Sequence, residues 1–479
     1  MLTTTDAAGA QTIRRYDAQG RLVSVTDALG HTRHLETNPA GLITAVTDSL
    51  GHTARVTYDA FGRVIAFTDP LGATTRLTRR PEGEITERIH PDGTRESWTY
   101  DPEGNVVAQT DQAGALTRFR IGPFGQLTTR TLPDGEEQSF EYDTELRLLA
   151  VTTNGATWRY QYDAAGHLIG ETDFNGRSLS YRLDGADQLM QTTDSAGRTT
   201  TFTYDTLGQL IERRNHDGTN TSLTYDDRGC LIRIANHAGA VEYTHDALGR
   251  VLSETVDGRT TTYTYDLLGR RTSRTTPTGI VSNWTYDANN QPTGVHNTIG
   301  ALGFAYDAGG RETTRNLGGG AALTQTWDAC NRLTGQSIWA YDGAPGADGT
   351  FTGVQARTYG YRPDGMPTTI RDQLRGHRTF DLTPAGRITR VTAQSWSETY
   401  AYDPPRQHHP RPEHPPIRQR HRGRAHLHRI TAAHRRPNQL RARRPRPPHP
   451  QAGAQPLRTA PRVALHLECR GPTGQDRHP

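Results

Sequence analysis

Hydrophobic and polar residues alternate along most of the chain in short stretches, and these stretches recur with a fixed period. Taking the tyrosine of a recurring Tyr-Asp-x-x-Gly pattern as the marker, we place nineteen registers between Tyr16 and Tyr402. Seventeen of the eighteen intervals are 20 or 21 residues, and the remaining one, from Trp327 to Tyr361, is 34 residues. A fixed period over this length indicates a repeat architecture, in which each unit is stabilised by stacking on its neighbours.

Each repeat predicts two short strands and two tight turns. Four residues after the tyrosine, fourteen registers have glycine, and three have Asp187, Asn290 or Asn331. These residue types tolerate positive φ best, so we expect a left-handed turn at this position. Leu146 and Arg406 break the rule, and the sequence offers no explanation for Leu146.

The rest of the repeat supplies the strands. An apolar position follows the first turn, and a second turn, often Thr-Asp-x-x-Gly, comes before the returning strand. That strand often has aromatic residues two positions apart, such as Tyr263 and Tyr265, which places both rings on one face. We therefore predict an all-β chain of tandem hairpins of about 21 residues. The residues chosen to represent the pattern are Tyr16, Asp17, Gly20, Tyr58, Asp59, Gly62, Tyr100, Asp101, Gly104, Tyr204, Asp205, Gly208, Tyr265, Asp266 and Gly269.

Composition divides the chain into two unlike parts. Residues 1–403 form the predicted repeat region, with a loop insertion at about 339–357 that is rich in Gly, Ala and Asp. Residues 404–479 contain 17 Arg, 10 His, 15 Pro and three acidic residues, a formal charge of +14, against −10 for the repeats. We expect this tail to be disordered.

Two hypotheses account for the tail. It is either a basic arm that binds nucleic acid or another polyanion, or the product of a frameshift. The chain has 55 Lys and Arg, all of them Arg, which suggests a GC-rich gene. Moving the frame by one base at Pro405-Arg406 gives Tyr-Asp-Pro-Arg-Gly-Asn-Ile-Thr, which restores the turn glycine and an apolar residue two positions later. We therefore favour the frameshift.

The recurring Tyr-Asp-x-x-Gly-Arg-Leu and Thr-Asp-x-x-Gly pattern resembles the RHS/YD-repeat family over about residues 10–403. The resemblance implies a β-sheet ribbon that spirals into a hollow shell, and in bacterial members this shell encloses a C-terminal toxin. Adjoining repeats or a toxin domain would be the partners, and the protein would be secreted or at the cell surface. The family's core block and self-cleavage residues are not found, so we expect a shell fragment truncated at both ends.

No residue pattern predicts catalysis, a cofactor or a metal site, so we expect a structural protein and not an enzyme. Cys230, Cys330 and Cys469 are far apart and are expected to be free thiols. An alternative function is carbohydrate binding or adhesion at a cell surface. The candidate sugar-stacking residues for that alternative are Tyr263, Trp284 and Tyr286. There is no run of 18 apolar residues and no visible signal peptide.

Overall fold

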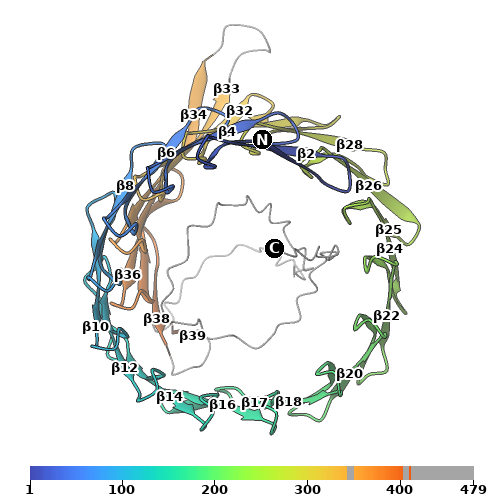
Figure 1. Ribbon diagram of the computed structural model, residues 1–479. Helices are drawn as coiled ribbons and strands as arrows, with labels where there is room; N and C mark the ends of the chain where they lie inside the picture. The colour runs from blue at the N-terminus through green and yellow to red at the C-terminus, as the bar shows by residue number, and fades with distance from the viewer. Residues whose placement is uncertain (342–349, 403–408, 412–479) are drawn as a thin grey trace, which may run out of the picture.

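The chain forms one antiparallel sheet in which each strand pairs with the strands before and after it in the sequence (Figure 1). The structure is a computed structural model, and it describes residues 1–341, 350–402 and 409–411. Within these residues there are strands and turns but no helix, so none that could span a membrane. The predicted all-β fold of tandem hairpins is confirmed.

The strands are β1 (Leu2–Thr5), β2 (Gln11–Tyr16), β3 (Leu22–Thr26), β4 (Thr32–Thr37), β5 (Ile43–Thr47), β6 (Thr53–Tyr58), β7 (Val64–Thr68), β8 (Thr74–Arg79), β9 (Ile85–Ile89), β10 (Arg95–Tyr100), β11 (Val106–Thr110), β12 (Leu116–Ile121), β13 (Leu127–Thr131), β14 (Glu137–Tyr142), β15 (Leu148–Thr153), β16 (Ala156–Tyr162), β17 (Leu168–Thr172), β18 (Ser178–Leu183), β19 (Leu189–Asp194) and β20 (Thr199–Tyr204). They continue as β21 (Leu210–Asn215), β22 (Asn220–Tyr225), β23 (Leu231–Asn236), β24 (Gly239–His245), β25 (Val251–Val256), β26 (Arg259–Tyr265), β27 (Arg271–Thr275), β28 (Val281–Tyr286), β29 (Pro292–His296), β30 (Ala301–Tyr306), β31 (Glu312–Gly318), β32 (Ala321–Trp327), β33 (Leu333–Tyr341), β34 (Phe351–Tyr361), β35 (Pro367–Asp372), β36 (Gly376–Leu382), β37 (Ile388–Ala393), β38 (Ser397–Ala401) and β39 (His409–Arg411).

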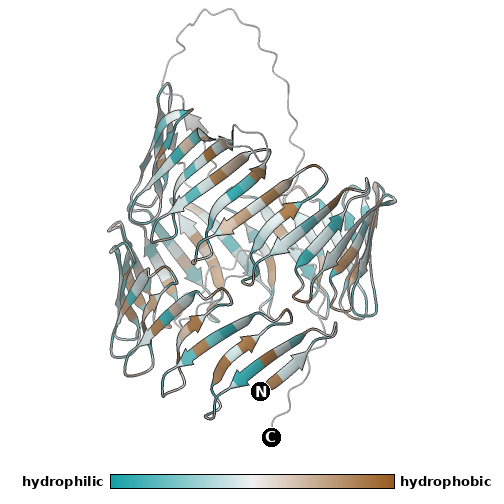
Figure 2. Cartoon of the chain, turned by 90° about the horizontal axis from the view of Figure 1, so that it is seen from above, coloured by the Kyte–Doolittle hydropathy of each residue, from teal (hydrophilic) through white to brown (hydrophobic). Residues whose placement is uncertain are grey.

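The ribbon of strands curves into a ring and then continues past its own beginning. In Figure 1 the strands run around a central space, and β33 to β38 come back over the region of β4 to β10. The same chain seen from the perpendicular direction forms two tiers, so the winding is a spiral and not a closed barrel (Figure 2). Right-handed twist between neighbouring strands makes a long antiparallel sheet coil in this way.

The wall of the spiral is a single sheet with little core. Apolar and polar residues alternate along the strands (Figure 2), so each strand contributes only every second side chain to a shared face. Among the described residues the fully covered hydrophobic side chains are few and mostly small, with Phe140 and Leu223 among the largest. Stability therefore comes from contacts between successive repeats along the ribbon.

The turns follow the predicted backbone conformation. Positive φ occurs at the turn glycines, such as Gly269 (φ 78°), and at Asp187, Asn290 and Asn331, which confirms that prediction. Leu146 has the same conformation with φ 61°, so it keeps the turn geometry in spite of its Cβ. The turn is bonded like its neighbours, because the Leu146 N–H donates to the carbonyl of Asp143 at 3.1 Å.

Two of the 20-residue intervals are explained by a shorter second turn. Asn154-Gly155 and Asp257-Gly258 each join two strands directly, with positive φ at both residues of the pair. Both pairs suit a two-residue hairpin whose twist matches that of the flanking strands. Each of these hairpins shortens its repeat by one residue and leaves the pairing of the two strands regular.

A β-bulge precedes each first turn from the marker Tyr16 to the marker Leu382, and nothing in the sequence pattern predicted it. At Tyr100, for example, the register shifts from Thr99↔Ala108 to Tyr100↔Val106. The same shift occurs at each marker position from Tyr16 to Leu382. An extra residue on one strand bends the strand and increases the local twist, so the bulge in each repeat adds to the curvature of the ribbon.

The break in the period is an elongated hairpin. The sequence predicted a loop over about residues 339–357, whereas the structure continues β33 to Tyr341 and begins β34 at Phe351. The two strands pair from Gly335↔Thr358 to Tyr341↔Phe351. In the predicted tail the structure describes only the backbone of β39, paired with β38. The rest of the tail, with its predicted disorder and polyanion binding, lies outside the described residues.

Candidate functional site

Many repeats are bonded to the next by a small set of polar contacts around the first turn, which we call the latch. In one example Asp266 Oδ1 accepts the backbone N–H groups of Leu268 and Arg270 at 2.9 and 3.0 Å. Asp266 Oδ2 accepts Arg270 Nε at 2.6 Å. The aspartate therefore shapes its own turn and also orients the arginine that follows the turn glycine.

The arginine of the latch extends into the following repeat. Arg270 Nη1 donates to the carbonyl of Asp287 at 3.2 Å and to Asn290 Oδ1 at 2.8 Å. Its guanidinium carbon lies 4.6 Å from the centroid of the Tyr286 ring, in cation–π geometry. The Tyr286 hydroxyl then donates back across the sheet to the carbonyl of Arg271 at 2.8 Å.

The tyrosine hydroxyl closes a gap that the strand pairing leaves open. The pairing of β5 with β6 ends at Ala45↔Arg55, three residues before Tyr58, so the two strands splay at this edge. The Tyr58 hydroxyl spans the gap and donates to the carbonyl of Ile43 at 2.7 Å. Equivalent hydroxyl-to-carbonyl bonds are Tyr100–Ile85, Tyr162–Leu148, Tyr204–Leu189, Tyr225–Leu210, Tyr265–Val251, Tyr286–Arg271, Tyr306–Pro292, Tyr361–Leu333 and Tyr402–Ile388.

Hydrogen bonds hold the turn aspartates in their charged form. The Arg21 backbone N–H, with the Arg21 side chain, lowers the pKa of Asp17 despite some desolvation. The Arg198 side chain is the largest cause of the lowered pKa of Asp194. Hydrogen bonding to the charged form of a carboxyl group favours that form, so Asp17 and Asp194 stay ionised well below neutral pH.

A second set of contacts joins the two tiers of the spiral, and we call it the seam. Asn289 Nδ2 donates to Asp48 Oδ2, 241 residues away in the sequence. Arg332 Nη2 donates to Asp92 Oδ2 at 2.9 Å, across 240 residues. Arg387 Nη2 donates to Glu136 across 251 residues. One wind of the ribbon therefore takes about 240–250 residues.

The seam joins opposite edges of the ribbon. Asn289 and Arg332 lie in or beside first turns, whereas Asp48 and Asp92 lie in second turns of the lower tier. Burial acts to raise the pKa of Asp92, but hydrogen bonds from Thr94, with Cys330 and Arg332, lower it to about 2. The seam contacts are mostly between polar side chains and do not form a backbone ladder.

The candidate sugar-stacking residues lie beside arginine side chains. The Arg271 guanidinium carbon is 4.5 Å from the Tyr263 centroid and 5.8 Å from the Trp284 centroid. Arg270 covers Tyr286 as part of a latch. Each of the three rings therefore already has a cation over it, and sugar binding stays a prediction.

The remaining predictions from the sequence concern the three cysteines and the absence of a metal site. Cys330 is a free thiol, as expected. The expectation is wrong for Cys230, which is disulfide-bonded. Cys469 lies outside the described residues. Within the described part of the chain, no three His, Cys, Asp or Glu side chains gather in a way that could hold a metal ion.

Comparison with known families agrees with the repeat geometry. The family profile described as RHS Repeat matches residues 1–32, 38–75, 58–95 and 100–137. The profile described as Teneurin YD-shell matches residues 126–265. Together the two profiles span more than half of the chain. The chain belongs to the RHS/YD-repeat family. The family resemblance drawn from the nineteen registers is thereby confirmed.

Solved structures similar to this RHS-repeat chain share its fold. A crystal structure described as TcdB2-TccC3-Cdc42 superposes with a TM-score of 0.52 and 15% identity, over 83% of this chain and 26% of the other. A second, TcdB2-TccC3 without its hypervariable C-terminal region, has a TM-score of 0.52 and 16% identity, over 81% and 23%. This chain thus spans about a quarter of the length of those chains. A search of curated proteins found no match.

Proposed function

We propose that this RHS-repeat chain is a wall segment of a hollow shell that encloses a polypeptide, which in an intact protein would be a toxin domain. The observation that carries the proposal is the spiral itself, in which a wall one sheet thick surrounds a central space and meets itself at the seam. A compact binding domain would have no need of such a wall. The role is structural and not catalytic.

The shared fold of the TcdB2-TccC3 structures supports this proposal. Because the chain spans about a quarter of their length, adjoining RHS repeats are the expected partners that would complete the shell. The enclosed polypeptide is the second expected partner. We expect the assembled protein to act outside the cell or at its surface.

Encapsulation can be tested by protease protection of an enclosed passenger. A small protease-sensitive reporter is fused to the end of the full chain, and its cleavage rate is compared with that of the free reporter. Encapsulation predicts slower cleavage in the fusion. The protection should decrease when the seam is weakened by Asn289→Ala together with Arg387→Ala. Equal cleavage rates for the free and fused reporters would contradict the proposal.

A further inference from the structure

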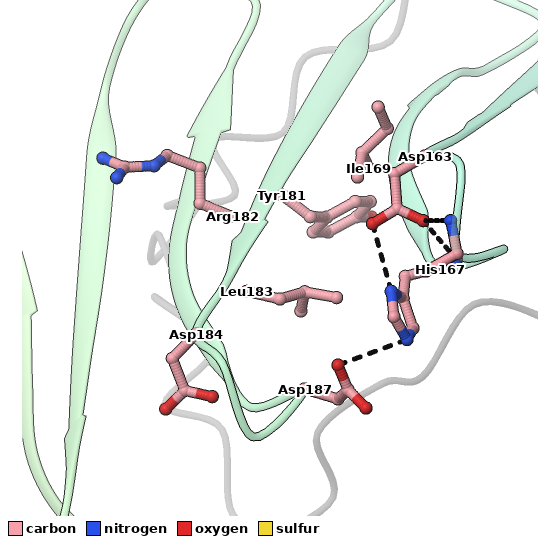
Figure 3. A pocket seen from close by; sticks show the side chains of 9 residues that line it. Asp163, His167, Ile169, Tyr181, Arg182, Leu183, Asp184 and Asp187 are labelled. Carbon is pink, nitrogen blue, oxygen red and sulfur yellow. Dashed lines mark hydrogen bonds and ion pairs between the residues drawn. The ribbon is translucent and has the colours of Figure 1, made fainter.

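The pocket in Figure 3 lies between the first turns of two successive repeats, at the ends of β16 and β18. Asp163, His167 and Asp187 form one side, and Tyr181 and Leu183 form the other. Leu183 points toward His167, whereas Arg182 and Asp184 point away from it (Figure 3). The pocket therefore occupies the position where a latch would be expected.

The pocket has a clear structural origin. Leu183 stands at the marker position that tyrosine fills in twelve of the nineteen registers. The pairing of β17 with β18 ends at Gly170↔Ser180, three residues before Leu183, so the strands splay here as they do in other repeats. Leucine has no donor, and among the described residues no side chain donates a hydrogen bond to the carbonyl of Leu168, which is the acceptor at this position.

The chain itself shows which groups fit such a gap. Ten tyrosines fill it with a phenol, as described above. Trp327 fills it with an indole, because its Nε1 donates to the carbonyl of Glu312 at 2.9 Å. Arg79 fills it with a guanidinium, because its Nε donates to the carbonyl of Val64 at 3.0 Å. All three are planar groups that carry a hydrogen-bond donor, and the phenol recurs most often.

The wall opposite Leu183 also suits an aromatic ring. In the preceding repeat an arginine covers the latch ring, because the Arg147 guanidinium carbon lies 5.2 Å from the Tyr162 centroid. His167 takes the place of that arginine here, with Nδ1 3.0 Å from Asp163 Oδ2 and Nε2 3.2 Å from Asp187 Oδ1. The hydrogen bond to Asp163 is the largest cause of the raised pKa of His167, which favours a cation facing the pocket.

We propose that this pocket binds a tyrosine-like phenol, whose hydroxyl donates to the carbonyl of Leu168 and whose ring lies between Leu183 and His167. The occupant is a phenolic side chain of a polypeptide that lies against this side of the wall. The proposal follows from the missing ring of one repeat and does not rest on the proposed encapsulation.

The test uses p-cresol, the analogue of the tyrosine side chain, with saturation-transfer NMR on the full chain. We expect p-cresol to give a signal and toluene, which lacks the hydroxyl, to bind several-fold more weakly. Leu183→Tyr places a phenol in the gap and should abolish the p-cresol signal. Tyr204→Phe is the matched control, because it removes a hydroxyl from the next latch and should leave the signal unchanged.

Two further variants keep the test decisive if Leu183→Tyr does not fold. Leu183→Phe fills the space without a donor and should also abolish binding. His167→Ala removes the cationic wall and should weaken p-cresol binding by about threefold or more. A p-cresol signal that persists in the Leu183 variants, or equal binding of p-cresol and toluene to the parent chain, would overturn the proposal.

Discussion

Successive strands of the ribbon and successive winds of the spiral are held together in different ways. Along the ribbon, each strand has a backbone ladder to both neighbours, and the latches add side-chain bonds such as Tyr286 to the carbonyl of Arg271. Across the seam, separate side-chain contacts such as Arg332–Asp92 and Asn289–Asp48 join the tiers. Continuous backbone hydrogen bonding therefore joins the strands of the ribbon, whereas separate side-chain contacts join the tiers at the seam.

This difference separates the stability of the wall from the closure of the shell. Partly exposed ion pairs contribute about 0–1 kcal/mol each, whereas a repeat lost from the ribbon removes two ladders and a latch. We therefore expect substitutions at the seam to separate the tiers while leaving the strands paired. Four predictions, from the largest expected effect to the smallest, test this view.

Acid should have the largest effect because it acts on many latches at once. The folded-state pKa values of the first-turn aspartates Asp17, Asp59 and Asp163 are lowered, so these groups stabilise the fold above their unfolded pKa of about 4 and lose that contribution as the pH falls through the folded values. Urea midpoints followed by circular dichroism should be constant from pH 7 to about pH 5 and fall steeply below about pH 4. Equal midpoints at about pH 5 and pH 2.5 would contradict the assigned role of the latches.

The Asp92 contact gives the acid experiment a second readout. With its pKa lowered to about 2, Asp92 should keep its bond to Arg332 until the pH approaches that value. Small-angle scattering across the same pH series should therefore show no opening of this contact before the ribbon begins to lose strand structure. An earlier expansion would mean that other seam contacts control closure.

Within the ribbon, Asp266→Ala should be the most damaging single substitution considered. It removes the acceptor for two backbone N–H groups and for Arg270 Nε, and we expect a loss of about 2–4 kcal/mol in unfolding free energy. Urea unfolding and hydrogen exchange across β26 to β28 would measure it. Asp227→Ala is the matched control, since Asp227 is exposed, and it should change stability by less than about 0.5 kcal/mol.

At the seam, Asn289→Ala combined with Arg387→Ala should change shape more than stability. The substitutions remove the bonds to Asp48 and Glu136 but leave every ladder in place, so the unfolding free energy should change by about 1–2 kcal/mol at most. Small-angle scattering should show a larger maximum dimension. Arg177→Ala, which breaks an ion pair within one turn, should leave the dimensions unchanged. A large fall in the urea midpoint of the double variant would mean that the tiers support each other's folding.

Leu146→Gly should produce the smallest effect and the opposite sign. Leu146 is held at φ 61° and is 44% exposed, so glycine should relieve backbone strain and stabilise the chain by about 0.5–1 kcal/mol. Leu207→Gly is the control, because this exposed leucine is not among the residues with positive φ, and it should not stabilise. A loss of stability in Leu146→Gly would mean that the Leu146 side chain makes contacts worth more than the strain.

Much of the fold could be predicted because one signal recurs along the chain. The turn glycines, the alternating strands and the repeat family all follow from the registers between Tyr16 and Tyr402. The bulge at each marker position could not be predicted, because it depends on how two strands pair. The reason why tyrosine and arginine recur at these positions of the repeat could not be predicted either, because the groups that accept their hydrogen bonds lie in neighbouring repeats.

The latch also shows why interruptions of the apolar position are tolerated. Arg271, Pro292 and Glu312 replace the usual aliphatic residue, yet their carbonyls accept the same cross-strand bond as those of Ile43 or Leu189. The acceptor belongs to the backbone, so the side chain at that position is free to vary.

The sequence by itself determined the local unit, which is two strands, two turns and a glycine or asparagine at positive φ. These features depend on residues a few positions apart, and the period repeats the same information. The tertiary structure decided the number of residues in one wind and the partners across the seam, such as Glu136 and Arg387. These depend on small bends and twists added over about 240–250 residues, and no short stretch of sequence specifies such a sum.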